Sequence, residues 1–308
     1  MKWLYLTISL LALPACSQQS DEQAAKGAST QALQVILIPA DGGTEDGTKA
    51  DFKPVFDALS QTSKLKFELR VGQSYNAVVE ALCSGSADIA FVGPAAYIQA
   101  HQRNCADLLA VGVENGKSEY YAGLFGRSSE GLKSLADVKG KTVAFGDVNS
   151  ASSFIVPVAM LIQAKIDPVQ DLAGIKLVGS HANAIAALNQ GQVDVAALSL
   201  VSFDKAVNQG AVDPTKVHLI ARSMALPNPP IVMRTSLDPA IKAKLKAAFD
   251  GLATAPGVTP DMLVGYGGKR VDRYDTAFSA DHFKPMSDMM EQVTPELKAA
   301  IMDKASKP

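Results

Sequence analysis

A serine-rich turn at residues 146–153 is the part of the sequence best suited to bind a charged ligand. It follows the apolar run Thr142–Phe145, which predicts a buried strand, and it precedes a segment with apolar residues at helical spacing. Serine hydroxyls and unpaired N–H groups would then meet at a helix start, where aligned peptide dipoles place partial positive charge. The turn therefore predicts an anion site. The alternative is that Ser150 or Ser152 only caps the helix.

Short apolar strands alternate with helical segments along most of the chain. The predicted strands include 33–38, 66–71, 87–92, 142–145 and 193–198. This alternation predicts an α/β fold with mainly parallel sheets. The frame A-L-x-x-G-x-x-D-[IV]-A occurs twice, at 81–90 and 187–196, and indicates two similar lobes. Helix starts at Tyr75, Gly93, Ser150 and His181 each follow a predicted strand, where open α/β sheets collect ligands.

The N-terminal residues indicate export. The apolar run Trp3–Leu13 follows a single lysine and is too short to span a bilayer as a stable anchor. It leads into Leu-Pro-Ala-Cys, which resembles a bacterial lipobox, with a plain secretory signal as the alternative. We expect residues 1–15 to be a lipoprotein signal peptide and Cys16 to carry a diacylglyceryl group. Residues 16–32, rich in Ser, Gln and Ala, would then be a flexible tether that holds the protein at a membrane, in the periplasm or at the cell surface.

The remaining cysteines and the overall charge narrow the classes of function. Cys83 and Cys105 most simply form one disulfide in an oxidising compartment, and two buried thiols are the alternative. The sequence has no CxxC or HxxxH spacing, so it predicts no metal site. The chain has 308 residues, 19% of them charged, and a formal charge of −2. This balance favours about two ordinary globular domains and no nucleic-acid partner.

With these segments placed, the chain resembles the type II periplasmic solute-binding proteins of ABC importers, and within them the phosphonate/phosphite/phosphate-binding family. The segments that carry the resemblance are 74–82, 85–97, 120–121, 135–146, 150–157 and 181–194. The resemblance implies two doubly wound lobes joined by two hinge strands, with a ligand held between the lobes. Lobe one would be 33–121 with 226–308, lobe two 122–225, and the hinges Tyr120–Phe125 and Ser223–Arg234.

The resemblance also implies which residues bind the ligand. In this family helix starts from both lobes hold an oxyanion, and the matching positions here are Tyr75, Tyr97, Ser150, Ser152, Ser153 and His181. The chain departs from the family pattern at three positions: Ala151 replaces a usual Thr, Ser153 a usual Gly, and Ser199 a frequent Asp. The missing Asp would neutralise a ligand ammonium, so its absence argues against an aminoalkylphosphonate and leaves the choice among related oxyanions open.

The resemblance thus implies a solute-binding lipoprotein of an ABC importer: a monomer without a cofactor that delivers a small phosphorus oxyanion to a membrane permease. It is not expected to be an enzyme. A hydrolase would need Ser150, His181 and Asp147 or Asp194 as a triad, but the chain has no GxSxG elbow. A ferric-binding protein of the same superfold, using Tyr120, Tyr121 and His181, would lack clustered carboxylates. A ligand-sensing subunit for a membrane kinase would share the same binding chemistry.

Overall fold

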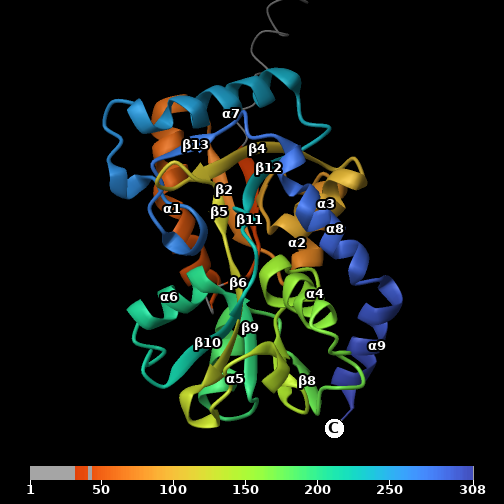
Figure 1. Cartoon of the computed structure of the whole chain (residues 1–308). Helices are drawn as coiled ribbons and strands as arrows, with labels where there is room; N and C mark the ends of the chain where they lie inside the picture. The colour runs from red at the N-terminus through yellow and green to blue at the C-terminus, as the bar shows by residue number, and fades with distance from the viewer. Residues whose placement is uncertain (1–31, 41–43, 308) are drawn as a thin grey trace, which may run out of the picture. The chain divides into compact units, whose positions relative to one another are not determined.

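Two mixed sheets carry the fold in the computed structural model, which describes residues 32–40 and 44–307 (Figure 1). The first sheet has six strands in the order β13 (Arg273–Asp275), β4 (Ala106–Val113), β12 (Pro230–Arg234), β3 (Ile89–Phe91), β1 (Leu33–Leu37) and β2 (Phe67–Val71). The second has five, in the order β10 (Val217–Arg222), β6 (Ala122–Arg127), β9 (Val195–Ser199), β7 (Thr142–Phe145) and β8 (Gly174–Leu177).

The direction of each strand depends on whether the chain reaches it through a connecting helix or through a crossing between the sheets. Strands β1, β2 and β3 are parallel, as are β7, β8 and β9, because a helix returns the chain between them. Strands β6 and β12 enter from the crossings between the sheets and pair antiparallel with β9 and β3. The structure confirms the predicted α/β class. The expectation of mainly parallel sheets is wrong, because the crossings add antiparallel strands to both.

A short two-stranded sheet joins the two larger ones. Strands β5 (Glu119–Tyr120) and β11 (Leu226–Pro227) pair antiparallel there. Beside them, Ser223 accepts from Ala122 N through Oγ at 2.9 Å and donates its own N–H to Ala122 O at 2.9 Å. The predicted single strand at 120–125 is divided at Tyr121, where the chain passes from β5 into β6.

Helices connect the strands, and several begin at a serine or threonine cap. The α-helices between strands are α1 (Glu45–Ser63), α2 (Tyr75–Cys83), α3 (Pro94–Gln102), α4 (Val156–Gln163), α5 (His181–Asn189), α6 (Leu200–Asn208) and α7 (Pro239–Gly251). The short turns are η1 (Ser128–Glu130), η2 (Leu135–Val138), η3 (Ala151–Ile155), η4 (Leu252–Thr254), η5 (Pro260–Met262), η6 (Tyr266–Gly268) and η7 (Ala280–Phe283). Ser74, Ser180 and Ser199 cap α2, α5 and α6 by accepting from the N–H three residues on.

The C-terminal helices α8 (Lys284–Gln292) and α9 (Pro295–Ser306) depart from the expected division into lobes. Figure 1 shows α9 in blue beside β8, and its Lys304 donates to Val169 O and Leu172 O, each at 2.6 Å. The end of the chain therefore packs on the second sheet, although residues up to 308 were expected to stay with the first. Backbone carbonyls of the 169–172 turn provide the acceptors that hold it there.

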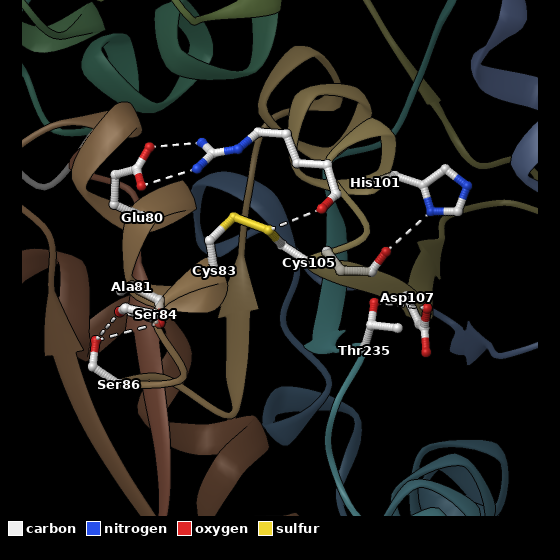
Figure 2. Close-up of a disulfide and its surroundings, with 11 residues drawn as sticks. Glu80, Ala81, Cys83, Ser84, Ser86, His101, Cys105, Asp107 and Thr235 are labelled. Atoms are coloured by element: carbon white, nitrogen blue, oxygen red, sulfur yellow. Dashed lines mark hydrogen bonds and ion pairs between the residues drawn. A yellow bond between two sulfur atoms is a disulfide. The ribbon is translucent and has the colours of Figure 1, made fainter.

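A disulfide joins the end of α2 to the residue before β4 (Figure 2). The Sγ atoms of Cys83 and Cys105 are 2.02 Å apart and the Cα atoms 4.7 Å apart. Beside it, both guanidinium NH2 groups of Arg103 donate to the Glu80 carboxylate, at 2.6 and 3.0 Å. Helices α2 and α3 also pack on each other, so the bridge constrains the helix pair whose starts belong to the candidate site.

The described part of the chain has no helix that is both long and apolar enough to cross a bilayer. The lipid-carrying residue expected from the sequence, Cys16, lies outside the described residues, as do the expected signal peptide and all but the last residue of the tether.

Candidate anion-binding site

Helix starts from both sheets meet at one place. The N–H of Tyr75, at the start of α2, donates to Asp147 Oδ2 in the turn after β7 at 3.1 Å. The Tyr75 ring also lies against Gly93, the cap of α3, where an added Cβ would be 3.5 Å from Tyr75 Cε1. The N–H of His181, at the start of α5, donates to Ala40 O after β1 at 3.2 Å. The structure thus brings together the starts of α2, α3 and α5 and the serine-rich turn.

The serine-rich turn opens as a π-helical turn, η3, where the sequence predicted an ordinary α-helix start. Ile155 N donates to Ser150 O at 3.0 Å, five residues back. Pro157 has no N–H to offer the Ser153 carbonyl, which instead accepts from Gly146 N at 3.0 Å. Wider turns of this kind occur frequently at functional sites. Here the turn follows Asp147, which accepts from the first N–H of α2.

The three serines of the turn are buried. Their exposed fractions are 2% for Ser150, 3% for Ser152 and 1% for Ser153. Ser150 Oγ accepts from Ser153 N at 3.2 Å and so caps the turn. Ser153 Oγ has no hydrogen-bond partner among the described residues, and it lies so close to Gly146 that an added Cβ there would be only 2.2 Å away. An unmet buried hydroxyl costs about 1–3 kcal/mol, which a bound acceptor would recover.

His181 is held in a defined tautomer. Its side chain is 1% exposed, and Nδ1 accepts from Ser199 N at 3.3 Å. Because a backbone N–H can only donate, Nδ1 carries the lone pair in the neutral ring and Nε2 carries the proton. His181 can therefore donate from Nε2 without being protonated. The same contact argues against the triad alternative, which requires Nδ1–H to donate to a carboxylate.

The side chain of Tyr97 packs in the protein core instead of joining these residues. Its ring packs on Phe283, at 4.7 Å between centroids, and on His101 at 5.4 Å. Burial raises the pKa of its phenol, and the charge of Asp107 adds to that shift. These are the contacts of a core side chain, so the structure groups Tyr75, Ser150, Ser152, Ser153 and His181 and places Tyr97 behind them.

Asn149, within the serine-rich turn, reaches both α3 and the distant helix α9. Its Oδ1 accepts from Gln99 Nε2 at 3.2 Å and from Lys298 Nζ at 3.0 Å. Burial lowers the pKa of the Lys298 ammonium, and the charge of Asp147 opposes this shift. Lys298 Nζ also lies 6.0 Å from the centre of the Phe154 ring. A cation thus stands behind the turn, which sequence reasoning missed because its partner is 149 residues away and no local pattern marks it.

Tyr266 is a second residue that the sequence patterns did not identify. Its Oη lies 3.0 Å from Ser199 Oγ and 2.9 Å from Ser202 Oγ, and its ring centre is 6.4 Å from that of His181. The sequence around it, Val-Gly-Tyr-Gly-Gly, carried one usable signal, since neighbouring glycines mark a turn.

The ferric-binding alternative finds no support in the hinge tyrosines. Tyr121 Oη donates to Glu119 at 3.3 Å, and the Arg222 guanidinium lies 4.3 Å above the Tyr121 ring. A cation on the ring disfavours a metal ion at the same residue. The described residues contain no cluster of three or more His, Cys, Asp or Glu side chains that could hold a metal ion.

Comparison with known proteins identifies the same family that the sequence resembles. A family model described as "ABC transporter, phosphonate, periplasmic substrate-binding protein" matches residues 43–289. The Phosphate-import protein PhnD of Mycolicibacterium smegmatis is 27% identical over 255 residues, covering 79% of this chain and 78% of that protein.

Two solved structures share the fold. A binding protein component of an ABC phosphonate transporter from Pseudomonas aeruginosa has a TM-score of 0.75 at 20% identity, covering 89% of this chain and 95% of that one. PhnD1 from Prochlorococcus marinus, in complex with methylphosphonate, has a TM-score of 0.71 at 19% identity, covering 85% and 98%. Both support the type II periplasmic-binding architecture expected from the sequence.

Proposed function

Because this chain belongs to the family of periplasmic substrate-binding proteins of phosphonate ABC transporters, we propose that it captures a phosphonate, phosphite or phosphate ion where its helix starts converge. The observation that carries the choice of site is the buried Ser153 hydroxyl, which has no partner among the described residues and belongs to the serine-rich turn. Family membership supports the role of a substrate-binding component of a transporter, and we propose no catalytic activity for it.

Neutral donors would hold the anion. We assign this role to the first N–H groups of η3, the hydroxyls of Ser152 and Ser153, the Tyr75 phenol and Nε2–H of His181. Ser150 acts mainly as the cap that shapes the turn, since its Oγ already accepts from Ser153 N. Fixed donors of this kind lose little entropy on binding and favour a small anion of matching shape.

Delivery would require the protein to stay near its permease. We propose that residues 1–15 are removed as a signal peptide, that Cys16 is lipidated and that residues 16–32 tether a monomeric binding protein to the membrane. Lipidation at one cysteine places the hydrocarbon chains in the bilayer, while the tether lets the folded part reach the transporter. Cys16→Ser should release the protein from the membrane fraction, and a Cys16→Ser protein that stays with the membranes would contradict the anchor.

Calorimetry tests the binding proposal. The protein is titrated with methylphosphonate, phosphite, phosphate and sulfate, and we expect binding of at least one phosphorus oxyanion with a Kd of about 1 μM or below, equivalent to about 8 kcal/mol. Iron is added to a second sample, where a visible tyrosine–iron absorption band would favour the ferric alternative. No heat from any phosphorus oxyanion would overturn the proposal.

A further inference from the structure

A cavity of about 210 Å³ lies next to the candidate site, on the other side of Tyr266. Aromatic side chains line much of it, among them Phe52, Phe91, Tyr120 and Tyr274. Three carboxylate residues, Glu114, Glu119 and Asp204, also line it, together with Lys269. Lys269 pairs with Glu114 at 3.9 Å, and Lys117 pairs with Glu119 at 3.0 Å. The lining residues still carry more negative than positive charge beside their apolar surface, which suits an organic cation better than an oxyanion.

Tyr266 stands between this cavity and the residues that would hold the anion. On one side it contributes to the cavity lining. On the other its hydroxyl joins Ser199 and Ser202, whose Oγ atoms are themselves 2.6 Å apart. Ser199 in turn contacts His181 through its backbone N–H. One tyrosine side chain is thus shared by the wall of the cavity and the residues around His181.

The loop that carries Tyr266 is firmly held. Gly265 N donates to Lys269 O at 2.7 Å, and the Tyr274 hydroxyl donates to Val264 O. Gly267 and Gly268 have φ values of 70° and 72°, a conformation that glycine adopts without strain. The ring itself packs edge-on against Tyr120, with 5.6 Å between centroids. The tyrosine is therefore positioned by its own loop and by its neighbours.

We propose that Tyr266 is a specificity-determining residue: it separates the anion site from the aromatic, acidic cavity, so that the protein accepts phosphate, phosphite or methylphosphonate and excludes phosphonates with longer substituents. This inference rests on the proposed function. Ser199, where a carboxylate would be needed beside the anion, presents a hydroxyl already bonded to Tyr266 and Ser202. Glu119, in the cavity lining, already pairs with Lys117, so we assign Asp204 of the same lining as the counter-charge that a ligand ammonium would use.

The test compares three ligands on three proteins by calorimetry. The ligands are methylphosphonate, butylphosphonate and 4-aminobutylphosphonate, and the proteins are wild type, Tyr266→Phe and Tyr266→Ala. We expect wild type and Tyr266→Phe to prefer methylphosphonate over both longer ligands by at least about tenfold, because the ring is present in both. Tyr266→Ala opens the cavity and should bind butylphosphonate at least about tenfold better than wild type does.

The carboxylates of the cavity provide a further, independent readout. In Tyr266→Ala the gain in affinity over wild type should be larger for 4-aminobutylphosphonate than for butylphosphonate. Asp204→Asn in the same background should reduce the difference between these two gains. Tyr266→Leu, which keeps an apolar side chain at the position, carries the same expectation if the alanine variant does not fold.

Two results would overturn the inference. One is a wild-type protein that binds methylphosphonate and butylphosphonate equally well. The other is an unchanged ratio of affinities in a folded Tyr266→Ala or Tyr266→Leu protein that still binds methylphosphonate. A wild-type protein that binds no phosphorus oxyanion would instead overturn the proposed function, and this inference with it.

Discussion

The backbone N–H of Tyr75 donates to the carboxylate of Asp147 at 3.1 Å, so that a residue in the turn after β7 contacts the first residue of α2. The second oxygen of the same carboxylate accepts from Asn149 N at 2.8 Å and orders the serine-rich turn. The start of α2 is therefore already occupied by an anionic group of the chain itself. The Asp147 side chain therefore couples the start of α2 to the shape of the serine-rich turn.

Replacing Asp147 tests this coupling. Asp147→Ala removes a hydrogen bond to a charged acceptor, worth about 1.5–3 kcal/mol, and should weaken methylphosphonate binding about tenfold. Asp147→Asn keeps an acceptor oxygen and should retain most of the affinity. Calorimetry on the two variants measures their affinities for methylphosphonate. Tighter binding by Asp147→Ala would show that the carboxylate mainly repels the ligand.

The serines of η3 should differ in their effects. Ser152→Ala removes a donor to the anion and should lower affinity about tenfold to a hundredfold, whereas Ser150→Asp places a negative charge at the turn and should abolish binding. Ser128→Ala, at an exposed serine far along the chain from the turn, is the matched control. Wild-type affinity in Ser150→Asp would place the anion elsewhere.

His181→Ala should reduce both affinity and stability. It removes the Nε2–H donor and leaves the Ser199 N–H, buried beneath it, without the acceptor that Nδ1 provides. The lost acceptor costs about 1–3 kcal/mol of unfolding free energy, measurable by thermal melting without ligand. His282→Ala changes an exposed histidine and serves as the control. An unaltered melting temperature in His181→Ala would contradict the assigned tautomer.

Lys298 should contribute positive charge to the site from behind the turn. Lys298→Met should weaken anion binding about threefold to tenfold, and Lys298→Arg less, because it keeps the charge. Burial lowers the pKa of Lys298, so it loses its proton at a lower pH than an exposed lysine. Affinity for a dianionic ligand should therefore begin to fall at a pH below the ordinary lysine pKa, and Lys298→Met should flatten this fall. Equal pH profiles in the two proteins would rule out the effect.

The disulfide should support stability more than binding. Reduction, or replacement of both Cys83 and Cys105 by Ala, frees a loop with a sequence separation of 22 residues. The chain-entropy model assigns such a loop about 3 kcal/mol of unfolding free energy, so the melting temperature should fall clearly. Affinity should change less, since the bridge joins the far end of α2 and not its start. If both thiols of the native protein are alkylated without prior reduction, the bond is absent in solution.

The sequence by itself determined the local elements of the site. Apolar runs located β1, β3, β7 and β9, and the polar residues that follow them located the starts of α2, α5 and the serine-rich turn, because strand burial and helix initiation depend on residues only a few positions apart. Its resemblance to known proteins also identified the family. It misjudged the finer form of the turn, since Pro157 has no N–H for the Ser153 carbonyl and that carbonyl instead accepts from Gly146 N, a contact that only the folded chain provides.

Only the tertiary structure decided which distant side chains complete the site. Tyr266 reaches Ser199 across 67 residues, Lys298 reaches Asn149 across 149, and Tyr97, although its helix begins at the site, faces Phe283 instead. Helix α9 likewise packs on β8 of the second sheet, although the sequence analysis assigned it to lobe one. Such pairings have no local pattern in the sequence, because they arise when separate elements are brought together by burial of their shared apolar faces.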